Sequence, residues 1–214
     1  MTVLDLGANQ GLYSLLAAKG VGREGKIIAF EPSSRERRAL RLHKLLNRRF
    51  NISIQPFAVG DREGEIDLHV MRARDSGCNS LRAPAADVGT EMNLERVRMV
   101  RLEEWLRKSG ILRIDLIKLD VEGGELDVLR GAGRLLDEGL RPVILAEVQD
   151  VRTKPWGYHA REIIKYLENK RYQWFSLVDD GSPVELDVKQ QEYEGNFIAC
   201  PKESIPLLRS KFYW

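Results

Sequence analysis

Apolar residues along the chain follow two spacings, and these predict strands and helices in alternation. Short apolar runs of strand length are bounded by Gly, Pro or charged residues, and segments with helical spacing separate many of them. The predicted strands are 2–6, 26–30, 52–59, 65–70, 97–102, 114–121, 142–148, 172–178 and 196–200. The predicted helices are 12–19, 34–49, 102–108, 125–136 and 158–170. Strands that alternate with helices are typical of βαβ units, so we expect an α/β fold with a mostly parallel sheet and helices on both faces.

The stretch 71–95 departs from this pattern. It carries Gly, Pro, Ser, Asn and charged residues without a clear period, which predicts a long irregular loop with one short helical turn. The chain has 214 residues, a length that suits a single domain spanning 1–214.

Charge and composition narrow the classes of partner. A net charge of +2 argues against nucleic acid or a membrane as a partner of the whole protein. Cys78 and Cys200 lie too far apart for a C-x-x-C pair and provide no disulfide framework. No apolar run approaches the ~20 residues that span a bilayer, and the N-terminus lacks a signal-peptide pattern, so we expect a cytoplasmic protein. Oligomerisation is left open.

Polar and glycine-rich clusters stand where the predicted strands end. These clusters are residues 5–11, Glu31, 60–61, 120–123 and Glu147. Because ligands of open parallel sheets bind at the carboxyl ends of the strands, we expect one cleft along this edge.

The glycine-rich turn after the first strand rules out one phosphate-binding motif and argues against a second. A P-loop requires a Lys and a hydroxyl residue after its last glycine, and this turn has neither. A dinucleotide fingerprint requires G-x-G-x-x-G, but Ala8 and Asn9 follow Gly7 and the next glycine is Gly11. A dinucleotide is therefore disfavoured.

A third pattern, D-x-G-x-x-x-G with an acid at the end of the second strand, resembles class I S-adenosylmethionine-dependent methyltransferases. Longer segments narrow the resemblance to the FkbM methyltransferase family. They are L-D-L-G-A-N-Q-G-L-Y at 4–13, A-F-E-P at 29–32, N-S-L at 79–81, A-V-G-D at 58–61, I-K-L-D-V-E-G-G-E-L at 117–126, L-R-G-A at 129–132 and L-A-E at 145–147. The resemblance covers roughly residues 2–148 in order and spacing.

This resemblance implies a Rossmann-like fold with a seven-stranded, mostly parallel sheet whose last strand is antiparallel. It also implies a cofactor half at about 1–120 and acceptor-side loops at about 71–96 and 149–160. Family members commonly carry helical segments before the first strand, and we expect that N-terminal lid segment to be absent because only Met1 and Thr2 precede the apolar strand core.

The cofactor implied by the resemblance is S-adenosylmethionine, with S-adenosylhomocysteine as product. The residues implied to bind it are Asp5, Gly7, Ala8, Asn9, Gly11, Tyr13, Glu31, Pro32, Asp61 and Asp120. Asp5 would meet the ammonium group directly or through water, and Glu31 would accept from both ribose hydroxyls. Asp61 would accept from the adenine amino group, although it also fits a turn residue. Tyr13 fits core packing equally well.

Lys118, Asp120 and Glu122 alternate along the strongest predicted strand and share one face as far as the strand continues. One reading is a structural pair between Lys118 and a carboxylate. The other is a catalytic group in which Asp120 or Glu122 removes the acceptor proton and Lys118 orients it. A divalent metal ion held by Asp120 and Glu147 is an alternative way to activate the acceptor hydroxyl, and the sequence does not assign such an ion.

The implied reaction is O-methylation of a hydroxyl on a small molecule such as a sugar, a polyketide or a related metabolite. An RNA or protein methyltransferase and a non-catalytic cofactor-binding module stay as alternatives. The arginine stripe between 37 and 48 could follow RNA phosphates, but it is more typical of a solvated helix face, so nucleic acid is disfavoured.

Overall fold

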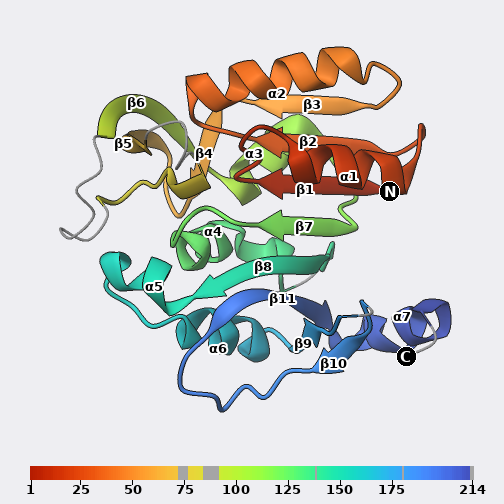
Figure 1. Ribbon diagram of the computed structural model, residues 1–214. Helices are drawn as coiled ribbons and strands as arrows, with labels where there is room; N and C mark the ends of the chain where they lie inside the picture. The colour runs from red at the N-terminus through yellow and green to blue at the C-terminus, as the bar shows by residue number, and fades with distance from the viewer. Residues whose placement is uncertain (72–76, 84–91, 138, 180, 213–214) are drawn as a thin grey trace.

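The computed structural model describes residues 1–71, 77–83, 92–137, 139–179 and 181–212. Its main element is an eight-stranded sheet with the order β10-β9-β11-β8-β7-β1-β2-β3. The strands are β1 (Thr2–Leu6), β2 (Lys26–Phe30), β3 (Ile52–Gln55), β7 (Leu116–Leu119), β8 (Val143–Gln149), β9 (Tyr172–Leu177), β10 (Pro183–Glu185) and β11 (Glu194–Pro201). In Figure 1 this order runs from β3 near the top to β10 near the bottom.

Most neighbouring strands in this sheet are parallel. The pairs β1·β2, β1·β7, β2·β3 and β7·β8 are parallel, whereas β11 is antiparallel to both β8 and β9. The antiparallel last strand is therefore confirmed. Seven strands form the predicted sheet, and the three-residue strand β10 extends its edge as an eighth.

A second sheet of three strands stands at the carboxyl ends of the main strands (Figure 1). It consists of β4 (Phe57–Gly60), β5 (Gly64–Met71) and β6 (Met92–Arg101) in the order β4-β6-β5. The prediction of one strand over 52–59 was wrong, because Pro56 has no backbone N–H and separates β3 from β4. The two halves then join different sheets.

The predicted loop 71–95 is too long at both ends. Met71 pairs with Met92 at the last register position of the antiparallel β5·β6 ladder, so β6 begins five residues before the predicted 97. The apolar pattern missed this because the extension is exposed and is held by backbone pairing. Residues 72–76 and 84–91 of the predicted loop lie outside the described residues.

Helices cover both faces of the main sheet, as predicted. The helices are α1 (Leu12–Val21), α2 (Ser34–Leu46), α3 (Leu102–Ser109), α4 (Glu125–Gly131), α5 (Asp150–Thr153), α6 (Arg161–Asn169) and α7 (Ile205–Phe212), and the short 3₁₀ turns are η2 (Gly133–Leu135), η3 (Lys154–Trp156) and η4 (Lys202–Ser204). The predicted helix 125–136 ends at Gly131, and Gly133 with a φ of 52° starts a 3₁₀ turn. The predicted helix 158–170 begins only at Arg161.

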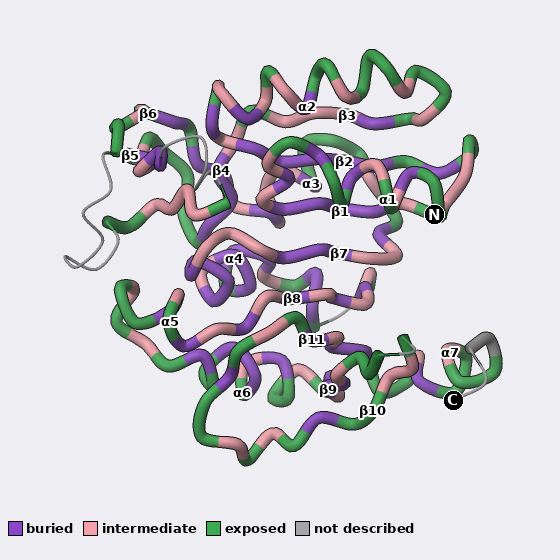
Figure 2. Tube along the Cα trace, in the orientation of Figure 1, coloured by how far each residue is buried: buried purple, intermediate pink, exposed green. Residues whose placement is uncertain are grey.

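Alternate residues of the central strands enter different cores, which explains their nearly continuous apolar runs. Leu4 and Leu6 of β1 belong to the large core that contains residues of α3, α4 and α6. Val3 packs instead with Ala18 of α1 and Leu40 of α2. Figure 2 shows these central strands as largely buried, with the exposed residues concentrated on the outer helices and loops.

Gly131 marks the closest approach between α4 and the small sheet. A Cβ atom at this position would lie 1.9 Å from the backbone oxygen of Gly60, which cannot move like the end of a flexible side chain. The absent side chain therefore lets α4 pack against the end of β4, next to the edge where the polar clusters gather.

We predict that Gly131→Ala destabilises the fold by about 2–3 kcal/mol, because the added methyl group overpacks a backbone contact. Gly20→Ala, in α1, is the matched control: a Cβ there meets nothing within 4 Å. The control should be neutral or gain about 0.5–1 kcal/mol from the better helix propensity of alanine. Urea unfolding of both variants measures the difference, and equal stability of the two would contradict the packing assignment.

Candidate active site

A cleft of about 430 Å³ opens at the carboxyl edge of β1, β2 and β7. Its lining joins residues from the first turn, the end of β2, β4, the 77–81 segment and the end of β7. The lining residues are Gly7, Ala8, Asn9, Gln10, Leu12, Tyr13, Phe30, Glu31, Pro32, Phe57, Ala58, Val59, Leu68, Gly77, Asn79, Leu81, Lys118, Asp120, Val121 and Glu122. A cleft is therefore present at the predicted edge, with a volume in the range of small-molecule sites. Of the five predicted clusters, residues 60–61 and Glu147 are not part of its lining.

The first turn fits under the end of β7 only because position 7 lacks a side chain. Gly7 has a φ of 82°, and a Cβ there would lie 1.8 Å from the carbonyl oxygen of Asp120. The N–H groups of Gly7 and Ala8 donate to the Phe30 carbonyl at 3.1 and 2.9 Å. Gly11, with a φ of 94°, begins α1, and a Cβ there would lie 2.2 Å from a methyl carbon of Leu40. The absent side chain at Gly7 thus shapes the cleft, whereas the absent side chain at Gly11 leaves room for Leu40 of α2.

Glu31 is held rigidly at the end of β2. Its two carboxylate oxygens accept hydrogen bonds from the backbone N–H groups of Asn9 at 2.7 Å and Ser33 at 2.8 Å. Burial raises the pKa of Glu31 to about 7, although the two N–H groups oppose this. Asn9 itself adopts a positive φ of 49°, so the turn and the Glu31 carboxylate hold each other in place.

Asp5 lies beneath the cleft. Its side chain is buried on the α1 side of β1, where it accepts a hydrogen bond from the Ser14 hydroxyl at 2.5 Å. Burial raises the pKa of Asp5, and the Lys118 ammonium 4.0 Å away opposes that shift. Among the described residues, Asp5 therefore contacts α1 and Lys118.

Lys118 connects Asp5 with the cleft. Its ammonium donates to Asp120 at 2.7 Å and to the Gly7 carbonyl at 3.4 Å, and it lies 4.8 Å from the centre of the Tyr13 ring. Burial alone would lower the pKa of Lys118, but Asp120 and Asp5 raise it, so the side chain stays charged. Tyr13 is 41% exposed at the cleft, so its contact is with Lys118 and it is not a core residue.

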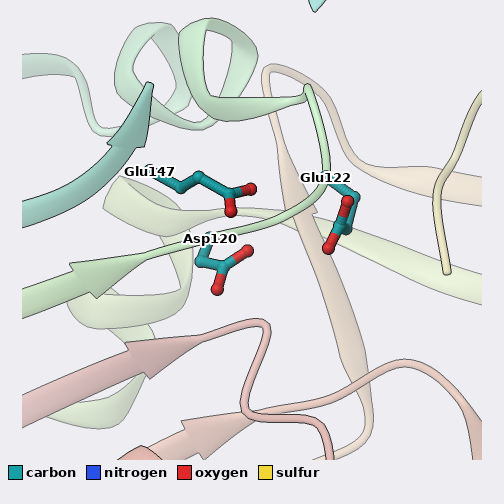
Figure 3. Close-up of side chains that lie close together, drawn as sticks. All are labelled: Asp120, Glu122 and Glu147. Carbon is teal, nitrogen blue, oxygen red and sulfur yellow. The ribbon is translucent and has the colours of Figure 1, made fainter. Parts of the chain in front are cut away.

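Three carboxyl groups, including that of Asp120, gather at the end of β7 (Figure 3). Asp120, Glu122 and Glu147 each offer an oxygen within 4.8 Å of the other two. The groups come from the end of β7, the turn after it and β8, and Figure 3 shows them pointing toward a common space. Oxygen ligands of this kind suit hard divalent cations. Here Lys118 pairs with Asp120, and Arg152 lies 3.0 Å from Glu122.

Crowding of these acids changes their titration. Burial, together with Glu147 and Asp120, raises the pKa of Glu122 to about 8, and Arg152 opposes the shift. Burial and Asp120 likewise raise the pKa of Glu147 to about 7. A carboxyl group that titrates near neutrality can both take and return a proton, which is what general acid–base catalysis requires.

The backbone around Glu122 is clamped from two distant segments. The Glu122 carbonyl accepts hydrogen bonds from Ser80 at 2.8 Å and from the Trp156 indole at 3.2 Å. Tyr158 donates to the Gly123 carbonyl at 2.5 Å. Glu122 has a φ of 58°, so these contacts hold a conformation that costs energy for a non-glycine residue. Trp156 and Tyr158 thus position this turn.

Sequence reasoning did not identify Ser80 and Arg152 as site residues. Ser80 belongs to the N-S-L element that carried part of the resemblance, so a signal for it existed. Arg152 stands in the short helix α5, and nothing in its local pattern indicates that its guanidinium reaches Glu122. His159, which follows α5 in the predicted acceptor-side loop 149–160, has a side chain that is 82% exposed.

Asp61 lies apart from the other predicted cofactor residues. It lines a small neighbouring cavity with Arg82, Asp127 and Trp156, and it pairs with Arg62 at 3.8 Å. Pro32, by contrast, lines the main cleft beside Glu31. The structure therefore brings Gly7, Ala8, Asn9, Tyr13, Glu31, Pro32, Lys118, Asp120 and Glu122 together around one cleft.

A family model, the methyltransferase FkbM domain, matches residues 5–174. The chain belongs to the FkbM methyltransferase family. The match includes every site residue described above and ends within β9.

Two characterised proteins resemble this FkbM-family chain. AMB antimetabolite synthetase AmbE of Pseudomonas aeruginosa is 30% identical over 183 residues, covering 70% of this chain and 8% of the synthetase. The 2-O-methyltransferase NoeI of Sinorhizobium fredii is 28% identical over 145 residues, covering 63% of this chain and 58% of NoeI. The chain thus spans only part of the length of either relative.

Solved structures share the fold. The methyltransferase FkbM from Methylobacillus flagellatus aligns with a TM-score of 0.55 and 16% identity, over 92% of this chain and 43% of that one. Fibrillarin from Aeropyrum pernix, solved with natively bound S-adenosylmethionine, aligns with a TM-score of 0.52 and 17% identity, over 92% and 65%. These similarities confirm the Rossmann-like methyltransferase fold. In the described part of this FkbM-family chain, no helix is both long and apolar enough to cross a membrane.

The raised carboxyl pKa values predict a pH-dependent stability. Glu31, Glu122, Glu125 and Glu147 bind protons more tightly in the folded chain than in the unfolded one, because burial raises each pKa to about 7 or 8. Their contribution is therefore fully present below the ordinary glutamate pKa of 4.5 and is lost as the pH rises from there through 7–8. Because one pKa unit corresponds to about 1.4 kcal/mol, a single such group accounts for about 2 kcal/mol, and we expect the free energy of unfolding to fall by at least that much between pH 5.5 and 8.5. Urea titrations measure it; Glu122→Gln should flatten the slope, and a rise with pH would contradict the assignment.

Proposed function

We propose that this FkbM-family chain binds S-adenosylmethionine in the cleft and methylates a hydroxyl oxygen of a small molecule. One observation carries the cofactor assignment: the Glu31 carboxylate lies at the cleft, fixed by two N–H groups beside a glycine turn that leaves room for a ligand. The family and the S-adenosylmethionine bound by fibrillarin support it.

Residues that line the cleft have the chemistry to contact each part of that cofactor. Glu31 already uses one acceptor site on each oxygen, and each oxygen keeps a second site for a ribose hydroxyl. Phe57, Ala58 and Val59 supply an apolar wall that suits a purine ring. The Gly7–Asn9 turn and Asp120 border the remaining part, where an amino-acid end would lie. When bound, S-adenosylmethionine supplies a methyl group on a sulfonium that leaves as a neutral thioether.

Glu122 is the group best placed to remove the acceptor proton. Lys118 donates directly to Asp120, so that carboxylate is committed to a structural pair. Glu122 lines the same cleft, and its Oε2 atom lies 3.0 Å from Arg152 Nε without a hydrogen-bond partner in the described chain. In this proposal Glu122 accepts the proton, Asp120 and Lys118 hold the end of β7, and Asp5 supports Lys118 from below.

The acceptor class rests on the carboxyl groups and on one relative. Glu122, Asp120 and Asn79 are hydrogen-bond acceptors and donors at the cleft, which suits a polyhydroxylated molecule such as a sugar. NoeI, a 2-O-methyltransferase, supports a hydroxyl acceptor.

Calorimetry with S-adenosylhomocysteine tests the cofactor site. Wild type should bind, and Glu31→Ala should bind about 30-fold or more weakly, because two hydrogen bonds to a charged acceptor are lost. Glu31→Gln keeps the shape and should lose less. Glu24→Ala, an exposed acid just before β2, is the control and should match wild type. No heat with wild type, or equal affinity of Glu31→Ala and wild type, would sink the cofactor assignment.

Methyl transfer from labelled cofactor to a panel of glycosides and polyols tests the base. Glu122→Gln should lower kcat about 10²–10⁴-fold and leave S-adenosylhomocysteine affinity within about threefold. The wild-type rate should rise with pH toward about 8, where Glu122 loses its proton, and Arg152→Met should move that rise to higher pH. If EDTA abolishes the activity and Mg²⁺ restores it, a metal ion activates the acceptor in place of the Glu122 base. Label entering total RNA but no small molecule would contradict the acceptor class.

A further inference from the structure

The outer face of α2 carries positive charge and exposed apolar side chains that do not belong to the cleft. Between 37 and 50 the sequence contains six Lys or Arg residues and no Asp or Glu. The whole chain has a net charge of only +2, so this helix concentrates positive charge on one side of a nearly neutral protein.

Three leucines stand among these cations. Leu42, Leu45 and Leu46 are 53%, 51% and 73% exposed, whereas Leu40 on the opposite side of the helix is fully buried. Arg38, Leu42 and Leu45 are spaced by four and three residues within α2, so they form one stripe along its outside, and Arg49 follows in the turn after the helix. Figure 2 shows α2 as an outer, largely exposed helix along the top of the molecule.

The exposed cations of this face have no acidic partner in the ranges that the structure describes. They are Arg38, Arg41, Lys44, Arg48 and Arg49. Arg48, just after α2, donates to the Leu45 carbonyl in the last turn of that helix, and Arg49 lies 4.8 Å from the centre of the Phe50 ring. Arg35, by contrast, pairs with Glu36. Positive charge on the outer face is therefore available to an external anion.

We propose that this face, residues 38–46 of α2 together with Arg48 and Arg49 just after it, docks on an anionic lipid surface. A lipid surface accommodates both components, because headgroup phosphates attract the cations while the leucines enter the boundary of the acyl chains. Long basic side chains also lie along apolar surface and keep their charge at the headgroups. The helix lies on the outside of the molecule, and a deformable lipid layer can cover it without a complementary groove (Figure 2).

Two other occupants fit this surface less well. Single-stranded RNA would use the cations, but its bases bind by stacking on aromatic rings, and this stripe offers leucines. A second copy of the chain in a two-fold dimer would bring the same cations against each other, which is repulsive. This inference concerns a surface away from the cleft and does not depend on the proposed methyl transfer.

Flotation of the full chain with vesicles tests the proposal. Wild type should float with phosphatidylcholine vesicles that contain about one third phosphatidylserine, and not with pure phosphatidylcholine. Arg38→Gln/Arg41→Gln/Arg48→Gln should reduce the bound fraction at least about tenfold, since each cation near the surface contributes. Leu42→Gln/Leu45→Gln/Leu46→Gln should reduce it by a similar factor through loss of apolar insertion.

Matched triple variants elsewhere control for charge and exposed leucine content. Lys154→Gln/Lys165→Gln/Lys189→Gln and Leu94→Gln/Leu112→Gln/Leu207→Gln change exposed residues outside α2 and should bind like wild type. Circular dichroism verifies that all variants are folded. Absence of wild-type flotation at low salt would overturn the proposal. Unchanged vesicle binding by the leucine variant would also overturn the proposal, as would tight binding of labelled single-stranded RNA that depends on the arginines alone.

Discussion

The approach of the first turn to the end of β7 is the contact on which the site depends. Gly7 lies under the Asp120 carbonyl at a distance that excludes any side chain, and Lys118 ties the same two segments through Asp120 and the Gly7 carbonyl. This contact places the glycine turn and the carboxyl groups of Asp120 and Glu122 on one cleft, although more than 100 residues separate the two segments. A side chain at position 7 would separate them whatever else the sequence kept.

Burial of acids around this contact has two opposite consequences. It makes the folded chain less stable as the pH rises, because burial favours the protonated forms of Glu31, Glu122 and Glu147. It also keeps Glu122 close to the titration range in which a base works. Lys118 and Arg152 each offset one of the carboxylates, so the cluster is tolerated. Natural sites often retain such a cost in stability where chemistry needs perturbed groups.

Similarity to known proteins and the geometry of the cleft meet at the same residues. The family match spans 5–174, and within it the turn, Glu31 and the Asp120–Glu122 segment border the cleft. The α2 surface also lies within the matched span, yet none of its exposed cations or leucines is among the residues that line the cleft. The chain therefore has two distinct surfaces, one for chemistry and one for docking, as proposed.

The sequence by itself determined the elements whose signals are local. Apolar runs bounded by glycine and acids placed β1, β2, β7 and β8, because a strand buried on both faces must be apolar along its length. The first turn and Glu31 could be recognised together, because their spacing is set by one short βαβ unit. Pro56 was visible too, although its effect on the strand over 52–59 was missed.

Only the tertiary structure decided how distant segments meet at the site. Ser80, Arg152 and Trp156 converge on Glu122 from two parts of the chain, and no local pattern encodes such a convergence. The structure also showed Asp5 beneath the cleft, Asp61 in a neighbouring cavity, and Glu147 beside Asp120 and Glu122. The physical reason is that side-chain contacts and pKa values depend on packing between elements, whereas periodicity reports only the environment of each element by itself.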